Sequence, residues 1–252
     1  MRVLASLEGL SSADRATLLD RLETLEPDRA TALLHALRTE TLQRCETDGW
    51  FWVTRFVRTR DEADTESIKP FPDKPYLEAI WREIDASQRV VIAKSRQLMI
   101  SWVLCAYAVW FARFHAHKTV LWQTQKEPDA FQMVCLAGAA KDGGVTARCQ
   151  FIERHLPEWM RLPVKESAGI LGYPNGSVIQ GIPGGKDQVR SRVASLIIED
   201  EFAFQEEAAG VYQAVAPLIQ KATKFIAVST PNGPTGMFAE LYHGVKQDVV
   251  TA

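Results

Sequence analysis

Leucines recur at helical spacing in the first part of the chain. They form two stripes on either side of Pro27: Leu18, Leu19, Leu22 and Leu25, and then Leu33, Leu34, Leu37 and Leu42. Side chains three and four residues apart lie on one face of a helix. Ser11 or Ser12 can cap the first turn. The pattern predicts helix over about residues 10–45, with an interruption at the proline.

The hydrophobic pattern changes twice after this helical region. Residues 59–74 are rich in charged side chains and contain prolines, which predicts a connecting arm. From Arg89 onward, short runs rich in β-branched residues alternate with helix-like segments. We therefore expect an N-terminal helical segment and arm over residues 1–58 and a second domain over residues 59–252.

The second domain has the pattern of a parallel sheet. The predicted strands are residues 90–93, 119–122, 196–198 and 225–228, and the predicted helices are residues 101–115, 127–140 and 206–221. Buried strands that alternate with helices are typical of a parallel sheet covered on both faces. A Pro174-Asn175-Gly176 turn between alternating apolar residues predicts an inserted β-hairpin. The predicted fold class is therefore α/β.

Composition limits the function classes. The 252 residues include 29 basic and 31 acidic side chains, a net charge of −2. A protein that wraps nucleic acid by itself is usually more basic, so we expect nucleic-acid contact to be local, transient or shared within an oligomer. The four cysteines lie far apart, which predicts free thiols in a reducing compartment. The longest apolar run, residues 100–112, is too short to span a bilayer, and no membrane association is expected.

Residues 89–102 have the outline of a phosphate-binding loop. A predicted strand leads into a short loop, and a helix starts at Ser101 or Trp102, so backbone N–H groups and a helix N-terminus would face an anion. The usual motif is not met, because Met99 and Ile100 replace its second glycine and its lysine. Lys94, at the front of the loop, has the length to reach the phosphates instead.

Two further side chains of this loop suit a nucleotide. Arg96 adds a second cation, and Ser101 offers a hydroxyl to Mg²⁺. Taken alone, the segment is more typical of an ordinary strand–turn–helix than of a nucleotide site.

Three acids follow the strand predicted over residues 196–198. Glu199, Asp200 and Glu201 repel one another unless a cation lies among them. Hydrolysis of a phosphoanhydride needs one carboxylate that holds Mg²⁺ and a second that activates water. Alternation along the strand points Asp200 and Glu201 in different directions, and we assign the metal to Asp200 and the base to Glu201. A solvated acidic strand end is the alternative interpretation.

A third strand, predicted over residues 225–228, ends in Ser229 and Thr230 before a Pro-Asn-Gly turn. Hydroxyls at the end of a central strand suit a sensor of the terminal phosphate. By itself this is an ordinary turn. Loop, acids and hydroxyls nevertheless occupy three successive strand ends, and ligands collect at such ends in open parallel sheets.

Together these segments resemble the ATPase domain of phage terminase large subunits. The matching stretches are the loop KSRQLMIS (94–101), the segments 49–59 and 68–81 before it, the acidic motif in 187–208 and the coupling motif in 228–233. Met99 departs from the glycine usual in that loop. The resemblance covers about residues 45–243 and implies a RecA-like P-loop fold, a central and mainly parallel sheet flanked by helices.

The resemblance also implies roles for individual residues. ATP contacts would come from the loop, Lys94, Ser95, Arg96, Gln97, Leu98, Met99, Ile100, Ser101 and Trp102, with Tyr76 and Phe71 near the adenine. Ser101 and Asp200 would bind Mg²⁺, Glu201 would polarise the attacking water, and Ser229 and Thr230 would couple hydrolysis to movement.

Packaging motors of this type carry an arginine that completes a neighbouring subunit's site. Arg190 lies where that arginine is expected, ten residues before Asp200, and Arg192 and Arg148 are its competitors. A salt-bridged surface arginine is the plain alternative for each of them.

The implied partners are double-stranded DNA, the portal protein of the procapsid, the small terminase subunit and further copies of the chain in a ring. The implied location is the cytoplasm of the infected host cell. Few residues follow Gly244, so no nuclease activity is expected of this chain. A helicase-like nucleic-acid ATPase and a scaffold that has lost its nucleotide are the alternatives.

Overall fold

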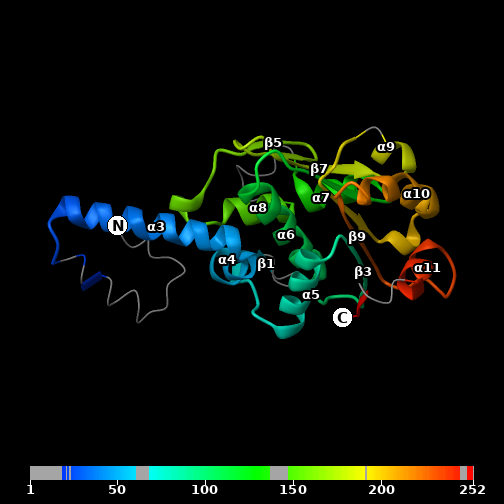
Figure 1. The fold of residues 1–252 in the computed structure, drawn as a ribbon, viewed down its shortest axis with the longest axis horizontal. Coiled ribbons are helices and arrows are strands. Elements are labelled where there is room, and N and C mark those ends of the chain that lie inside the picture. Colours follow the sequence, from blue (N-terminus) through cyan, green and yellow to red (C-terminus); the bar gives the residue numbers. More distant parts are fainter. Residues whose placement is uncertain are drawn as a thin grey trace. The chain divides into compact units, whose positions relative to one another are not determined.

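The computed structural model describes residues 19–20, 22, 24–60, 68–136, 147–190, 192–244 and 249–251 (Figure 1). Contacts divide the chain into two units. The first consists of Met1–Pro72 and Ile152–Arg161, and the second of Asp73–Phe151 and Leu162–Ala252. This division does not test whether residues 1–58 and 59–252 fold independently, so that boundary stays a prediction.

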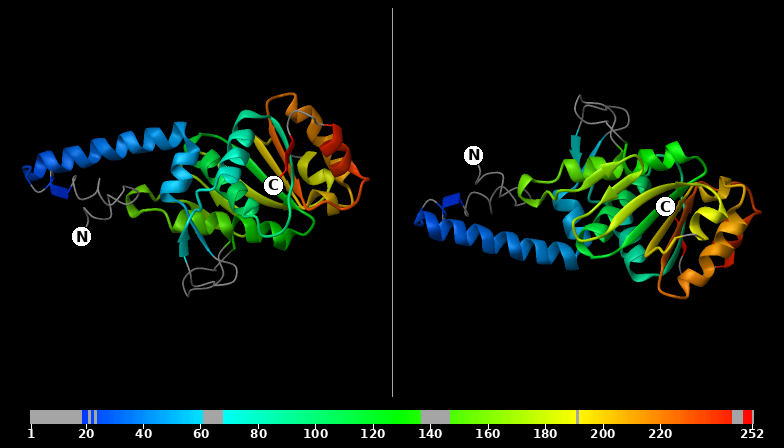
Figure 2. Two further views of the ribbon diagram at one scale, coloured as in Figure 1. Left: turned by 90° about the horizontal axis from the view of Figure 1, so that it is seen from below. Right: turned by 90° about the horizontal axis from the view of Figure 1, so that it is seen from above.

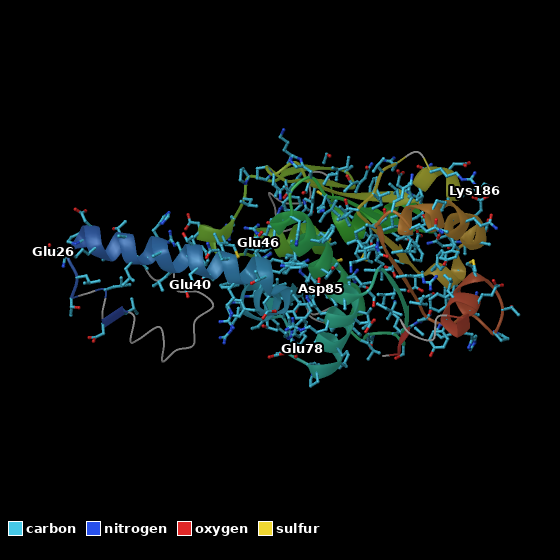
Figure 3. All side chains as sticks on the ribbon, viewed as in Figure 1. Glu26, Glu40, Glu46, Glu78, Asp85 and Lys186 are labelled. Atoms are coloured by element: carbon cyan, nitrogen blue, oxygen red, sulfur yellow. The ribbon has the colours of Figure 1, made fainter. Side chains whose placement is uncertain are left out.

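The first unit holds the long helix α3. It spans Pro27–Thr47, and Glu26, Glu40 and Glu46 mark its course in Figure 3. Pro27 is its first residue, where a missing N–H costs no helical hydrogen bond. The predicted interruption at Pro27 and the helix that follows are confirmed. Residues 10–18 of that prediction lie outside the described part of the chain.

Three short elements complete the first unit: helix α4 (Gly49–Phe56), the strand pair β1 (Arg58–Arg60) and β2 (Ile68–Pro70), and the 3₁₀ turn η1 (Glu158–Met160). The Asp48 carboxylate caps α4 by accepting the Phe51 N–H at 3.2 Å. Strands β1 and β2 pair antiparallel. The arm predicted over residues 59–74 therefore contains most of a two-stranded ribbon, which its charged, proline-containing sequence does not indicate.

The second unit is built on a mostly parallel sheet. The described residues contribute eight strands in the order β10-β3-β9-β8-β4-β7-β6-β5. Their bounds are β3 Arg89–Ala93, β4 Thr119–Thr124, β5 Lys165–Ser167, β6 Ile170–Gly172, β7 Val178–Pro183, β8 Leu196–Asp200, β9 Lys224–Ser229 and β10 Val249–Thr251. Pairing is parallel from β10 to β7 and antiparallel beyond. All four predicted strands and the α/β fold class are confirmed.

Helices cover both faces of this sheet (Figure 2). Their bounds are α5 Pro75–Ala86, α6 Ile100–Phe114, α7 Glu127–Val134, α8 Arg148–Arg154, α9 Lys186–Arg190, α10 Ala208–Ile219 and α11 Met237–Gly244. Figure 1 places α5 and α6 on one side of β3 and β9, and α10 and α11 on the other. Phe225 and Ala227 of β9 pack in one cluster with Val211, Val215 and Phe238 from the latter helices.

Two of the three predicted helices lie close to their expected bounds. Helix α6 corresponds to the helix predicted over residues 101–115, and α10 corresponds to the helix predicted over residues 206–221. The third, predicted over residues 127–140, is wrong after Val134, where α7 stops and Cys135 is extended. Residues 137–140 of that prediction lie outside the described part of the chain. A tertiary contact accounts for the stop, since the Cys135 carbonyl accepts the N–H of Gly169 at 2.9 Å.

The predicted hairpin joins β6 to β7. Gly172 pairs with Val178, and the Tyr173 N–H donates to the Ser177 carbonyl at 2.8 Å across the turn. Gly176 has φ +83, a conformation that side chains other than glycine rarely adopt. Asn175 anchors the turn by donating its amide Nδ2 to the carbonyls of Ala112 and Arg113 near the end of α6, both at 3.0 Å.

Two predictions from composition can be compared with the described residues. All four cysteines, Cys45, Cys105, Cys135 and Cys149, are buried free thiols. Among the described helices, none is long and apolar enough to cross a membrane.

Candidate functional site

Sheet topology gathers three strand ends at one edge. Strand β9 lies between β3 and β8, so Ala93 pairs with Ser229 and Asp200 pairs with Val228. After β3 the chain passes through α6 to β4, on the far side of β9 and β8. Where the strand order changes direction in an open parallel sheet, a crevice forms at the carboxyl ends of the strands. The loop after β3, the acids at the end of β8 and the hydroxyls at the end of β9 therefore meet, as the sequence predicted.

Lys94 and Glu201 make the central contact of this edge. The Lys94 ammonium Nζ lies 3.0 Å from Glu201 Oε1. The second oxygen, Oε2, accepts a hydrogen bond from Thr230 Oγ1 at 3.4 Å and lies 3.4 Å from Ser229 Oγ, whose proton is shared with the Thr230 carbonyl at 2.8 Å. The Lys94 side chain is 11% exposed and that of Glu201 is 44% exposed. One carboxylate thus contacts the lysine of the loop and both predicted coupling hydroxyls, and solvent reaches it.

Glu201 reaches this position because the strand has already ended. Strand β8 stops at Asp200, and Glu201 has φ +50, a left-handed conformation. Its backbone N–H donates to Asp200 Oδ1 at 3.0 Å. The assumption that both acids alternate along one strand is therefore wrong for Glu201. The left-handed backbone of Glu201, and not the pleat of the sheet, sets the direction of its side chain.

Glu199 and Asp200 are buried inside the same edge. Burial raises the pKa of Asp200 to about 6, although Lys94 and, more weakly, Arg148 favour its charged form. Burial raises the pKa of Glu199 to about 8, against a lowering by a hydrogen bond from Gln205 Nε2 at 3.1 Å. Glu199 is thus held as a neutral acid inside the sheet.

The loop itself has an unusual backbone. Gln97 and Met99 have φ +62 and +61, left-handed values that favour glycine. Met99 stands at the motif position where glycine is usual, and it adopts the conformation that glycine would supply. The loop is also bound to β9, the neighbour of β3 in the sheet, because the Lys94 N–H donates to the Ser229 carbonyl at 3.0 Å.

The predicted ATP-binding residues differ in exposure along the loop. Ser95, Arg96 and Gln97 are exposed, and Leu98, Met99 and Ser101 are partly buried. Ile100 and Trp102 are buried at the start of α6. These two side chains face the core, so any phosphate contact at their positions would come from the backbone.

Tyr76 and Phe71 lie in different units. The Tyr76 hydroxyl, near the start of α5, donates to the Leu98 carbonyl of the loop at 3.3 Å. Phe71 is buried in the first unit, with its ring edge-on to Trp50 at 5.9 Å between centroids. Contact of either ring with adenine stays a prediction.

The three candidate arginines differ in their contacts. Arg190, the last residue of α9, has a side chain 54% exposed and 3.8 Å from Asp187. Arg192 donates to Gln180 Oε1 at 2.7 Å. Arg148 lies over the Trp102 ring at 5.7 Å, and its charge acts on Asp200. Arg190 is thus the candidate whose charge is most open to another molecule.

Gln205 is a site residue that the sequence does not reveal. Its amide Nε2 donates to the Glu199 carboxylate at 3.1 Å and to the Asp200 carbonyl at 3.2 Å. It follows the turn η2 (Phe202–Phe204) directly, and it is 8% exposed. Only the path of that turn brings it back to β8, so no spacing rule would have found it.

The described residues hold no group of three or more His, Cys, Asp or Glu side chains suited to a metal ion. Mg²⁺ is the metal that the sequence predicts, and it is usually bound by one or two carboxylates, waters and substrate phosphates. Asp200, buried at the strand end, and Ser101, the second residue of α6, are the oxygen donors predicted for it.

The fold matches solved structures of phage large terminases. The HK97 bacteriophage large terminase aligns with 79% of this chain and 41% of its own, at 10% identity and a TM-score of 0.55. The large terminase of a thermophilic bacteriophage aligns with 72% of this chain and 45% of its own, at 12% identity and 0.54. The Thermus phage P74-26 large terminase ATPase domain aligns with 68% of this chain and 70% of its own, at 16% identity and 0.51.

These similarities establish the fold: over 68–79% of its length the chain matches the RecA-like α/β fold of phage large terminases. The chain spans less than half the length of two of these proteins. The large terminase of the thermophilic bacteriophage has also been solved in complex with ADP and with ATP-gamma-S. Neither a protein-family model nor a curated protein matches this sequence.

Proposed function

We propose that this chain, which has the fold of phage large terminase ATPase domains, hydrolyses ATP to drive double-stranded DNA into a procapsid. The observation that carries the proposal is the contact of Glu201 with Lys94, Ser229 and Thr230 at the crevice of the sheet. A basic loop residue, a solvent-reached carboxylate and two hydroxyls at adjoining strand ends are the parts that phosphoanhydride hydrolysis needs.

In the proposed reaction Lys94 binds the β- and γ-phosphates, and the backbone of the loop and the start of α6 bind their oxygens. Glu201, 44% exposed, holds the attacking water and accepts its proton. Ser101 and Asp200 hold Mg²⁺, which neutralises charge on the phosphates when it is bound. Asp200 must be ionised for this role, and its pKa of about 6 leaves it mostly ionised at neutral pH.

Ser229 and Thr230 carry the proposed coupling. Both hydroxyls lie 3.4 Å from Glu201, and both stand at the end of β9, which pairs with β3 on one side and β8 on the other. A change at Glu201 as the phosphate leaves therefore acts directly on the strand between the loop and the acids. Movement of that strand end would be the first step of translocation.

The remaining partners follow from the same proposal. Arg190 would complete the site of a neighbouring copy in a ring, and the ring would act with the portal protein and the small terminase subunit in the infected cell's cytoplasm. Such an arginine contributes roughly 10³–10⁵ in rate in other nucleotide hydrolases.

The test is phosphate release from ATP by the purified chain, with and without Mg²⁺. We expect Mg²⁺-dependent release that the Glu201→Gln variant lacks while it still binds ATP. A chain that binds no ATP would instead be a scaffold with a degenerate site. Release stimulated by single-stranded rather than double-stranded nucleic acid would favour a helicase-like ATPase.

A further inference from the structure

A side chain from outside the phosphate loop holds the peptide carbonyl of Leu98 in that loop. Leu98 lies between Gln97 and Met99, which both have left-handed backbones. Its carbonyl accepts the hydroxyl of Tyr76 at 3.3 Å. Left-handed conformations are unfavourable for side chains other than glycine and persist only where surrounding contacts impose them. The Tyr76 hydrogen bond is a contact at the middle of that unfavourable stretch.

Tyr76 is fixed on a well-anchored helix. Leu77, Ile80, Trp81 and Ile84 of α5 are buried. At the other end of α5, the Lys224 ammonium donates to the carbonyls of Ile84, Asp85 and Ser87, which the helix leaves without intrahelical partners. The hydroxyl that reaches Leu98 is therefore presented by a rigid element and not by a loose side chain.

A fixed carbonyl also fixes the next N–H. In a planar trans peptide the C=O of one residue and the N–H of the next point in opposite directions. Holding the Leu98 carbonyl toward Tyr76 thus directs the Met99 N–H away from α5. Backbone N–H groups in this kind of loop are the groups that bind phosphate oxygens.

We propose that Tyr76 is a positioning residue that sets the direction of the loop's N–H groups through the Leu98 carbonyl, independently of any base. This inference rests on the proposed binding of nucleotide phosphates. It assigns the hydroxyl of Tyr76 a function that a stacking contact with adenine would not need.

The test uses Tyr76→Phe, which removes the hydroxyl and keeps the ring. Mg²⁺-ATP and Mg²⁺-tripolyphosphate, which has no base, are titrated by calorimetry. We expect the dissociation constants of both ligands to rise by a similar factor, about threefold to tenfold, as for the loss of one neutral hydrogen bond. Tyr107→Phe is the matched control. It removes a hydroxyl that donates to Asp85 at 3.3 Å, at the opposite end of α5, and should leave both constants unchanged.

If the Tyr76 hydroxyl only stabilised the fold, both variants would have a lower melting temperature and the same affinities for the two ligands. Unchanged binding of both ligands by Tyr76→Phe would overturn the inference, and so would weaker binding of ATP alone. If the wild-type chain bound neither ligand, the proposed function itself would fail, which is a different result.

Discussion

At the scale of single residues, the position of the lysine decides how the loop would bind phosphate in the proposed function. Lys94 points to Glu201 at 3.0 Å, whereas Ile100, which stands where the usual motif has its lysine, is 2% exposed. Lys94→Ala should abolish ATP binding or turnover. Ile100→Ala should lower stability by about 2–5 kcal/mol and leave nucleotide affinity largely intact. Nucleotide titration and urea unfolding of both variants check this, and normal hydrolysis by Lys94→Ala would contradict the loop assignment.

The two acids at the end of β8 should give separate phenotypes. Glu201→Gln keeps Asp200 for the metal and loses the base, so it should bind Mg²⁺-ATP normally and turn it over at least 10²-fold more slowly. Asp200→Asn should weaken the affinity for Mg²⁺-ATP, because a buried carboxylate is lost as ligand. Affinities measured beside single-turnover rates separate the two effects. Exchanged phenotypes would mean that the metal and base roles are reversed.

Glu199 should make stability depend on pH. Its pKa is 4.5 in the unfolded chain and about 8 in the fold, so only the folded state keeps this proton between those values. The free energy of unfolding should therefore fall as pH rises, by at most about 1.4 kcal/mol per pH unit. Glu199→Gln, which keeps the shape without the proton, should flatten this dependence and be relatively most stabilising above pH 8. Equal slopes for variant and wild type in urea unfolding from pH 5 to 8.5 would refute it.

The order of strands and polar residues along the sequence was enough to predict which side chains meet at the crevice. Lys94, Asp200 and Ser229 lie at the ends of predicted strands, and parallel pairing brings strand ends together. The direction of Glu201 was not predictable in the same way, because it depends on a left-handed turn that the sequence does not announce. Gln205 was missed because its contacts with β8 exist only once that turn is made.

At the scale of elements, the inserted hairpin serves as a cap for α6, the helix that starts at the phosphate loop. Asn175 donates to two carbonyls near its C-terminal end, which otherwise lack helical partners. Asn175→Ala should lower the free energy of unfolding by about 1–3 kcal/mol. Asn232→Ala, which removes a more exposed contact with the Ala203 carbonyl, is the control and should cost less than about 0.5 kcal/mol. Equal losses in urea unfolding would contradict the capping role.

Periodicity predicted elements well where local preference and burial agree. All four strands of β-branched residues were found, since each is buried on both faces. The end of α7 and the ribbon of β1 and β2 were not found. Both depend on hydrogen bonds to distant residues, Gly169 for α7 and the opposite strand for the ribbon. Such contacts leave no periodic signal.

At the scale of the whole molecule, the question is whether one chain holds a complete site. Arg190 is the exposed candidate for a neighbour's site. Specific ATPase activity should then rise with protein concentration. A mixture of Arg190→Ala, which keeps its loop, and Lys94→Ala, which keeps its arginine, should recover turnover that neither shows alone. Activity independent of concentration, with no recovery in the mixture, would place Arg190 outside catalysis in trans.

The contact of Lys94 with Glu201 has a consequence for which anions the site accepts. The carboxylate is the lysine's counterion, and because it belongs to the same chain, its effective concentration beside the lysine far exceeds that of ions in solution. A monovalent anion such as chloride competes poorly with such a tethered partner. A polyphosphate brings several charges at once and also binds the N–H groups at the start of α6. Glu201 should therefore keep monovalent anions away from Lys94, whereas a multivalent phosphate ligand should displace the carboxylate and bind.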